Sequence, residues 1–331
     1  MNSVTNFDYT VEPHEPHWIS RRAHPILVVS LILCETGLAL AACYDHYWIA
    51  AALVLATSHV LHGLVICLHE ASHGLLRKSR LLNEIDGVVA GIFSLSSFSL
   101  YRVAHQSHHA YLATERDEEL WPFVNPEVPR GVRVLAAVLE LTVGFLYTPL
   151  LFLRIFLRPG SPIRSKKVRR RIWIELGLMV LVWSAILTYD TYFHAWKYFL
   201  WMYFLPAWVA GNAQSLRKYV EHVGLMGSTV NSSTRSIIAE GWWANFLSVT
   251  LLHEPYHGVH HGRAGLTHAE LPLHVGILEP KTSEEQPPYQ NYGAAFRDLF
   301  ASLPNPRVGA QWHRVTATAE ESEELPSQVE A

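Results

Sequence analysis

The chain has 331 residues, of which 50% are hydrophobic and only 17% charged, and its formal net charge is −3. The positive mean hydropathy and the gathering of apolar residues into long runs favour one membrane domain with polar ends over several soluble domains. We expect no nucleic-acid partner. The three cysteines form no CxxC pair, which argues against a thiolate zinc site and leaves them as small apolar residues.

The first apolar segments predict a hairpin of two transmembrane helices. Residues 1–24 are polar and proline-containing, and they are expected to form a flexible arm. The runs Ile26–Tyr44 and Trp48–Leu68 follow, with three residues between them. Each has about 20 residues, or roughly 30 Å of helix, which matches the hydrocarbon core of a bilayer. Basic residues before the first run and at positions 77–80 place the open ends of this hairpin in the cytoplasm.

The middle of the chain is less regular. Leu81–Leu100 is rich in Ser and Gly and is expected to lie at the membrane interface. Val134–Leu157 is apolar enough to span, but both of its flanks are expected in the cytoplasm, because Arg154–Arg171 contains eight Lys or Arg and no acid. We therefore predict a re-entrant or surface-lying helical hairpin, bent near Thr148–Pro149.

A second transmembrane hairpin is predicted from Ile172–Tyr189 and Trp196–Ala213, and Trp242–Leu252 is a further interfacial segment. Residues 303–331 are rich in Pro and Glu and are expected to be disordered. The predicted fold is all-α and integral to the membrane. It has four transmembrane helices in two hairpins, interfacial helices and a cytosolic histidine-rich cap, all within residues 25–302.

Three histidine clusters occur along the chain: His69 and His73 (HxxxH), His105, His108 and His109 (HxxHH), and His257, His260 and His261 (HxxHH). Positions i, i+3 and i+4 share one face of a helix, and several imidazoles aimed at one point suit a transition metal. In the predicted topology all three clusters fall on the cytoplasmic side. Eight histidines exceed the four ligands of one zinc ion, so two metal ions are expected. The spacing alone leaves iron, zinc and manganese open.

The three clusters in this order, with two membrane hairpins, resemble the membrane fatty-acid desaturase superfamily, which also contains alkane hydroxylases and carotenoid ketolases. The boxes read HEASH, HQSHH and HGVHH here. The resemblance covers roughly residues 25–275 and implies a non-haem centre of two iron ions that uses O2 to oxidise a lipid. Desaturation of a fatty acyl chain is the expected reaction, and hydroxylation or ketone formation is the alternative. Since the chain has no fused HPGG stretch, the resemblance implies a separate electron carrier of the ferredoxin, rubredoxin or cytochrome b5 type.

The stretch KYVEH at 218–222 resembles the Asn-Tyr-x-Glu-His element of the hydroxylase branch, with Lys218 in place of Asn. By this resemblance His222 is a ninth ligand, and the alternative is a surface histidine after a helix. The implied metal ligands are His69, His73, His105, His108, His109, His222, His257, His260 and His261.

Acidic residues near the clusters are candidates to accept a hydrogen bond from the second ring nitrogen of a ligand. We assign this role to Glu70, Asp117 and Glu254, and interpret Glu115, Glu118 and Glu119 as solvated loop acids.

Two other functions remain open. HExxH occurs at 69–73 and at 253–257, which is the pattern of zinc peptidases. An intramembrane peptidase would leave both HxxHH clusters unexplained, and Pro255 disfavours an ordinary helix in the second pattern. A metal transporter is less favoured, because most histidines collect at one membrane face. The basic loop Arg164–Arg171 is interpreted as a topology anchor, with docking of an acidic electron carrier as the alternative.

Within the first hairpin, Glu35 and His59 are predicted to lie at the same depth, roughly 13–14 Å from the cytoplasmic end. A buried ionisable group usually faces a partner, so a Glu35–His59 hydrogen bond is expected. His62, water or another helix is the alternative partner of Glu35.

Overall fold

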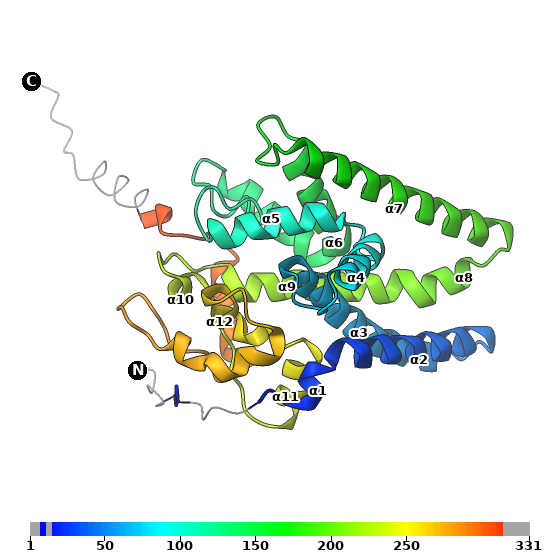
Figure 1. Ribbon diagram of the computed structural model, residues 1–331, viewed down its shortest axis with the longest axis horizontal. Coiled ribbons are helices and arrows are strands. Elements are labelled where there is room, and N and C mark those ends of the chain that lie inside the picture. Colours follow the sequence, from blue (N-terminus) through cyan, green and yellow to red (C-terminus); the bar gives the residue numbers. More distant parts are fainter. Residues whose placement is uncertain (1–6, 11–14, 314–331) are drawn as a thin grey trace, which may run out of the picture.

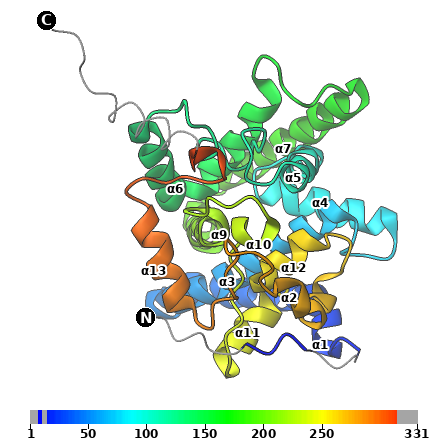
Figure 2. The ribbon, with the colours of Figure 1, turned by 90° about the vertical axis from the view of Figure 1, so that its left-hand side faces the viewer.

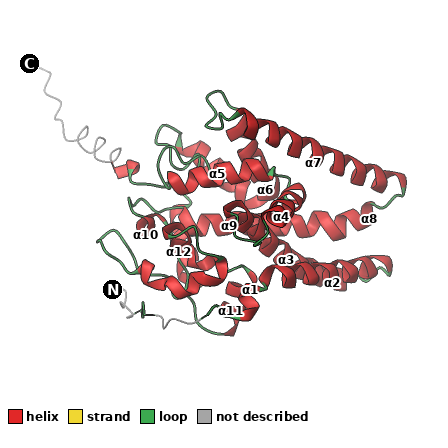
Figure 3. Ribbon diagram, viewed as in Figure 1, coloured by secondary structure: helices red, strands yellow, loops and turns green. Residues whose placement is uncertain are grey.

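The computed structural model describes residues 7–10 and 15–313. Within that part of the chain the structure is helical and has no strand, only an isolated bridge between Ile237 and Tyr289. Two long helical hairpins extend to the same side (Figure 1). The shorter helices and most of the loops gather at the other end (Figure 3). The predicted all-α fold is confirmed.

The first hairpin consists of α2 (Ala23–Cys43) and α3 (Tyr47–His73). Helix α3 continues beyond the predicted apolar run by one more turn, which carries His69 and His73. It ends at Gly74, whose φ of +80° gives the left-handed C-cap that glycine adopts at little cost. The first histidine box is therefore a direct extension of a membrane-type helix.

The second hairpin pairs one long helix with a helical stretch of three parts. It is built from α7 (Lys166–Tyr192), α8 (Trp196–Tyr198), the π-helical segment η1 (Phe199–Phe204) and α9 (Leu205–His222). Its tip lies beside the tip of the first hairpin, where Lys197 Nζ donates to Asp45 Oδ1 at 2.8 Å. Both tips therefore lie at the end of the molecule away from the histidine boxes (Figure 1).

Four helices are long and apolar enough to cross a membrane: α2, α3, α6 (Arg130–Leu157) and α7. The number of candidate spans agrees with the four that were predicted, but one of the four helices is a different one. The expected crossing Trp196–Ala213 is divided by the π-helical segment, and α6 takes its place among the four. The bent pair α4 (Arg80–Phe93) and α5 (Phe98–Ala110), with 99° between its helices, would be a fifth if it forms one span.

Helix α6 is not the hairpin predicted for this segment. It continues through Pro149, and its non-helical residue is Val143. The expected bend near Thr148–Pro149 is therefore wrong. The break at Val143 is stabilised by Asn212 of α9, which accepts from Gly144 N at 2.7 Å and donates to Thr142 O at 2.8 Å. A polar side chain of a neighbouring helix thus satisfies the backbone groups that the break would leave free.

An interhelical network holds the acid in the apolar stretch of α6. The Glu140 side chain is 1% exposed and contacts Lys218 Nζ of α9. Tyr219 Oη and Thr148 Oγ1 each donate to Glu140 at 3.1 Å. A buried carboxylate is tolerable when it is paired and hydrogen-bonded in this way.

Helix α5 carries the second histidine box, and its first turn is fixed by a buried acid of α7. Glu175 accepts from Ser97 Oγ (2.6 Å), from Ser99 N (2.8 Å) and from Ser99 Oγ (2.6 Å). A carboxylate at a helix N-terminus satisfies free N–H groups and favours the helix dipole. The segment expected to lie at the interface, Leu81–Leu100, thus comprises α4 and the start of α5.

The remaining elements form the cap. They are α1 (Trp18–Arg21), α10 (Val230–Ser233), α11 (Trp242–Thr250), η2 (Glu254–Tyr256), α12 (His257–Gly262), η3 (His268–Leu278) and α13 (Tyr292–Ser302). Figure 2 shows α1 and α11 at one edge of the molecule, with α13 on another. Trp242 and Trp243 of α11 are exposed there, as suits an interfacial helix.

The division into arm, membrane domain and tail stays a prediction. Ser20 in the expected arm is buried, and so are Val308 and Trp312 beyond the expected boundary at 303. Val308 N donates to Phe123 O at 3.0 Å, which ties this part of the chain to the core. Residues 314–331, including the five glutamates of the tail, lie outside the described residues.

The predicted Glu35–His59 pair is wrong. His59 Nε2 lies 2.8 Å from Thr250 Oγ1 of α11, and its ring stacks on Phe246 with centroids 5.5 Å apart. Thr250 is 191 residues away in sequence, so the depth argument within one hairpin could not identify it.

Candidate metal centre

The nine predicted ligands lie together at the ends of α3, α5 and α9 and on α12. Their ring nitrogens form two clusters. We call His69, His73, His105, His109 and His260 the first histidine group, because one nitrogen of each lies within 4.8 Å of the others. His222 belongs to two further sets whose ligand-type atoms also lie within 4.8 Å of one another. One set contains His222, His108 and His261, and the other contains His222, His257 and Glu221. The four histidines of these sets form the second histidine group.

Each HxxHH box supplies both groups. In α5 the i, i+4 pair His105 and His109 belongs to the first group, whereas His108 belongs to the second. In α12 the pair His257 and His261 belongs to the second group, and His260 belongs to the first. Residues i+3 and i+4 share one face of a helix with residue i, but they are offset around the helix axis in opposite directions from it. The box spacing therefore places ligand-type nitrogens on two neighbouring points from a single helix.

The second ring nitrogen of several histidines faces an acceptor. His105 Nδ1 lies 3.1 Å from Glu119 Oε2, and His108 Nδ1 lies 2.8 Å from Asp117 Oδ2. These contacts fix the ring orientation and place the proton on Nδ1, which leaves Nε2 as a bare lone pair.

In the second histidine group two bare nitrogens point at each other. His222 Nδ1 donates to Ser233 O, a carbonyl that can only accept, and His257 Nδ1 faces carboxylate oxygens of Glu254 (3.3 Å) and Glu221 (3.5 Å). The two Nε2 atoms are nevertheless only 2.9 Å apart. Neither carries a proton for the other, so a cation between them would relieve the repulsion of their lone pairs. His261 Nε2 is also buried and has no hydrogen-bond partner in the structure.

The spacing of the nitrogens suits a metal ion. In the first group the Nε2 atoms of His69 and His260 are 3.0 Å apart, and those of His105 and His109 are 3.1 Å apart. Two ligands at right angles, each about 2.1 Å from one ion, are about 3.0 Å from each other. Burial lowers the pKa of His257 to about 4 and those of His260 and His261 well below the usual value. These imidazoles are therefore neutral near pH 7 and able to act as ligands.

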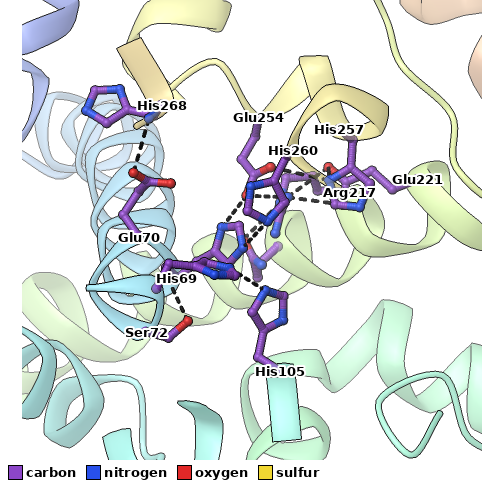
Figure 4. Close-up of polar contacts among 12 residues, drawn as sticks. His69, Glu70, Ser72, His105, Arg217, Glu221, Glu254, His257, His260 and His268 are labelled. Carbon is purple, nitrogen blue, oxygen red and sulfur yellow. Dashed lines mark hydrogen bonds and ion pairs between the residues drawn. The ribbon is translucent and has the colours of Figure 1, made fainter. Parts of the chain in front are cut away.

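One carboxylate contacts both groups. Glu254 Oε1 forms an ion-pair contact, not an aligned hydrogen bond, with His69 Nδ1, while Glu254 Oε2 faces His257 Nδ1. Arg217 of α9 donates to both oxygens of Glu221 at 2.8 and 3.0 Å and lies 3.2 Å from Glu254 Oε1. Figure 4 shows this arrangement, with Glu254 between the two histidines.

The predictions for the acids are partly right. Asp117 and Glu254 contact ring nitrogens as expected, but Glu70 points away from the groups and accepts from His268 N at 3.2 Å (Figure 4). Glu119, interpreted as a solvated acid, instead contacts His105. Glu221 and Arg217 were not identified. The loop after α5 contains several acids close together, and the sequence does not indicate which of their side chains turn inward. The i, i+4 spacing of Arg217 and Glu221 was a usable signal.

The geometry also weakens the HExxH interpretation. Glu70, the general base that the first pattern would require, does not face the histidine group. In the second pattern His253 lies in a left-handed conformation (φ +54°) before a short 3-10 turn that contains Pro255. Its ring nitrogens bond Ser20 and Ser248 instead of joining His257. Neither pattern thus presents two histidines and an acid to one point.

Lys218, in the position where the resembling element has Asn, does not join the histidine groups. Its amine contacts Glu140 of α6, as described for the core of that helix. Any contact that an Asn side chain would make with the centre is therefore absent at this position.

Comparison with known proteins agrees with these features. A family model described as fatty acid desaturase matches residues 46–293, which include all nine histidines. The chain is 26% identical over 136 residues to a chloroplastic omega-3 fatty acid desaturase of Glycine max, covering 41% of this chain and 29% of that protein. It is 29% identical over 139 residues to an acyl-lipid omega-3 desaturase (cytochrome b5) of the endoplasmic reticulum of Arabidopsis thaliana, covering 41% and 34%. The match thus spans about a third of the length of these relatives. The family model covers most of the chain, and the chain therefore belongs to the fatty acid desaturase family.

Proposed function

We propose that this protein is an O2-dependent membrane oxidoreductase that introduces a double bond into a fatty acyl chain of a lipid. The observation that carries the proposal is the convergence of ring nitrogens from nine histidines on two neighbouring points. Two electrons and two protons would come from the acyl chain and two electrons from a carrier, with two protons from solvent, so that O2 is reduced to two waters.

The nine histidines are proposed to hold two iron ions, five ligands in the first group and four in the second. The fit rests on the donor set, because neutral imidazole suits iron, and on the nitrogen spacing given above. When bound, an iron pair supplies the redox capacity to oxidise an unactivated C–H bond with O2.

The chain's own residues would orient these ligands and keep water out. Asp117, Glu119 and Glu254 hold the Nδ1 protons, so each ring presents its lone pair inward. Behind α5, Tyr101 stacks on His105 with ring centroids 5.4 Å apart, and buried Leu100 and Phe152 pack on the same side. An apolar wall of this kind excludes water, which strengthens electrostatic interactions and limits side reactions.

The position of the centre supports a lipid substrate. His69 and His73 occupy the last turn of α3, a candidate span, so the proposed centre lies next to the apolar part of the helix. An acyl chain would reach it from the bilayer, whereas a polar soluble substrate would gain nothing from this location. Both relatives are omega-3 desaturases, which is in keeping with an acyl chain as the substrate.

We further propose that the histidine end faces the cytoplasm and receives electrons from a separate carrier. The loop before α7 and the first turns of that helix expose Arg164, Lys166, Lys167 and Arg170, and basic residues mark cytoplasmic segments. The same charges would suit an acidic carrier of the ferredoxin, rubredoxin or cytochrome b5 type.

Mass spectrometry of lipids from cells that express the chain tests the proposal. A desaturase gives acyl chains that have lost two hydrogen atoms, and a hydroxylase or ketolase of the same superfamily gives chains that have gained oxygen. Cells with the His260→Ala variant are the matched control, because His260 Nε2 lies 3.0 Å from the Nε2 atoms of both His69 and His109 in the first group. Identical lipid profiles in the two cell lines, with both proteins present in the membrane, would contradict the proposed oxidation of lipids.

A further inference from the structure

We infer that Glu254 is a positioning residue shared by the two histidine groups, so that metal binding at both groups depends on it. The inference rests on the metal-binding part of the proposed function. Its two carboxylate oxygens divide between the groups: Oε1 contacts His69 Nδ1 in the first, and Oε2 lies 3.3 Å from His257 Nδ1 in the second. Among the described acids that touch these rings, Asp117 and Glu119 each serve a histidine of one group only.

An unusual backbone conformation just before Glu254 positions this residue. Leu252 and His253, the two residues before it, have φ of +51° and +54°, a region that side-chain-bearing residues rarely adopt. Leu252 is 1% exposed and locked in the core. A conformation of this kind persists only where the surroundings over-determine it, and it often marks a functional position.

The side chain of His253 is what secures this turn. Its Nε2 bonds Ser20 Oγ of α1, and its Nδ1 bonds Ser248 Oγ of α11, both at 2.8 Å. On the other side of Glu254, the Pro255 carbonyl accepts from Ile237 N at 2.8 Å. Glu254 is therefore held from three separate elements, and none of these contacts belongs to the histidine groups.

Arg217 makes the shared carboxylate stable in a buried site. Glu254 and Glu221 have side chains 3% and 7% exposed, and the guanidinium of Arg217 contacts both. The ion pairs compensate the burial of the acids. They also hold Glu254 in its ionised form, in which both oxygens accept and neither donates.

Replacing Glu254 with Gln tests whether both carboxylate oxygens are needed. A Gln at this position keeps the shape of Glu but offers one acceptor oxygen and one donor NH2. It can accept from His69 or from His257, but not from both. Loss of such an outer partner typically costs about 10–100-fold in metal affinity. The ring that keeps a contact keeps only a neutral amide oxygen, a weaker acceptor than a carboxylate, so we expect metal binding to weaken at both groups.

The experiment compares Glu254→Gln with Asp117→Asn and Glu119→Gln in full-length protein in detergent or nanodiscs. Each metal-free protein is titrated with ferrous iron, the bound metal is measured, and Mössbauer spectra of isotopically enriched samples distinguish single ions from pairs. Glu254→Gln should bind both ions about 10–100-fold more weakly than the wild type, whereas each control should weaken one ion.

Thermal unfolding of the metal-free proteins separates loss of the shared partner from misfolding. If Glu254→Gln does not fold, the double variant Ser20→Ala, Ser248→Ala loosens the turn without touching the centre, and it should also weaken both ions. Wild-type affinity for both ions in the folded variant, or weakening of one ion alone, would overturn the inference. A wild-type protein that binds no iron would instead overturn the proposed function, and the inference with it.

Discussion

His108 and His109 are consecutive in the chain but belong to different histidine groups. His109 Nε2 lies 3.0 Å from His260 Nε2 and 3.1 Å from His105 Nε2 in the first group. His108 lies with His222 and His261 in the second group and is fixed by Asp117. One turn of α5 thus serves both proposed metal sites, and the two sites are held at a fixed separation by the helix itself.

Replacing one histidine of each group should abolish product formation without removing the protein from the membrane. His108→Ala deletes a second-group nitrogen and His260→Ala a first-group nitrogen, and neither residue lies in one of the four long candidate spans. Each variant should lose turnover and weaken one of the two ions. Lipid analysis and metal content of the purified variants check this. Near-normal product from both would rule out the two-iron interpretation.

The buried pair between α6 and α9 should be a major stabilising contact. Lys218→Met leaves Glu140 without its cation in an apolar helix, and breaking a buried pair from one side costs about 3–5 kcal/mol. The double variant Glu140→Gln, Lys218→Met should lose much less than the sum of the single losses. Unfolding midpoints in detergent measure both.

The matched control for that pair is Lys197→Met, which removes the exposed contact with Asp45 at the hairpin tips. Such surface pairs contribute about 0–1 kcal/mol, so its unfolding midpoint should stay close to that of the wild type. Equal losses for Lys218→Met and Lys197→Met would show that burial of Glu140 is not what makes its partner important.

Substitutions of His253, in the turn before Glu254, should change the stability of the protein through the backbone conformation as well as through lost contacts. His253→Val and His253→Gly both remove the bonds to Ser20 and Ser248. Valine also pays about 1–2 kcal/mol for a left-handed conformation, which glycine adopts freely. The glycine variant should therefore be the more stable of the two in thermal unfolding. The reverse order would mean that the positive φ at this position imposes no strain.

Accessibility labelling tests the orientation of the hairpins. After replacement of the three native cysteines, single cysteines are introduced as Lys78→Cys, Lys167→Cys and His194→Cys, all at exposed positions. The first two should react from the cytoplasmic side, and the third from the opposite side, because His194 lies at a hairpin tip. Labelling of positions 167 and 194 from the same side would contradict the proposed topology.

The histidine centre was predictable because its signal is local. The i, i+3 and i+4 spacing places the ring nitrogens on one face whatever the tertiary structure, and α5 and α12 keep that spacing. The division into two groups was not predictable, since it depends on how α5 and α12 face each other. For the same reason Glu119 was missed, because its inward turn is set by the packing of the loop and not by its neighbours in sequence.

The membrane segments show the same contrast. Long apolar runs identified α2, α3 and α7 because their composition alone decides the outcome. Helix α6 was misinterpreted because both of its flanks were expected on one side of the membrane and the bend was placed at Pro149. The break lies at Val143 instead and is satisfied by Asn212 of α9, while Lys218 of α9 pairs with the buried Glu140. These partners lie 68 and 78 residues away in sequence. The Glu35–His59 pair failed similarly, because Thr250 supplies the partner of His59 from a distant helix.

Metal analysis of the purified wild-type protein is the most direct test of a two-iron centre. The five and four nitrogens of the two histidine groups predict two iron ions per chain, with Mössbauer parameters of nitrogen-ligated, non-haem iron. A single zinc ion per chain, or a preparation active on lipids that contains no iron, would contradict the proposed centre.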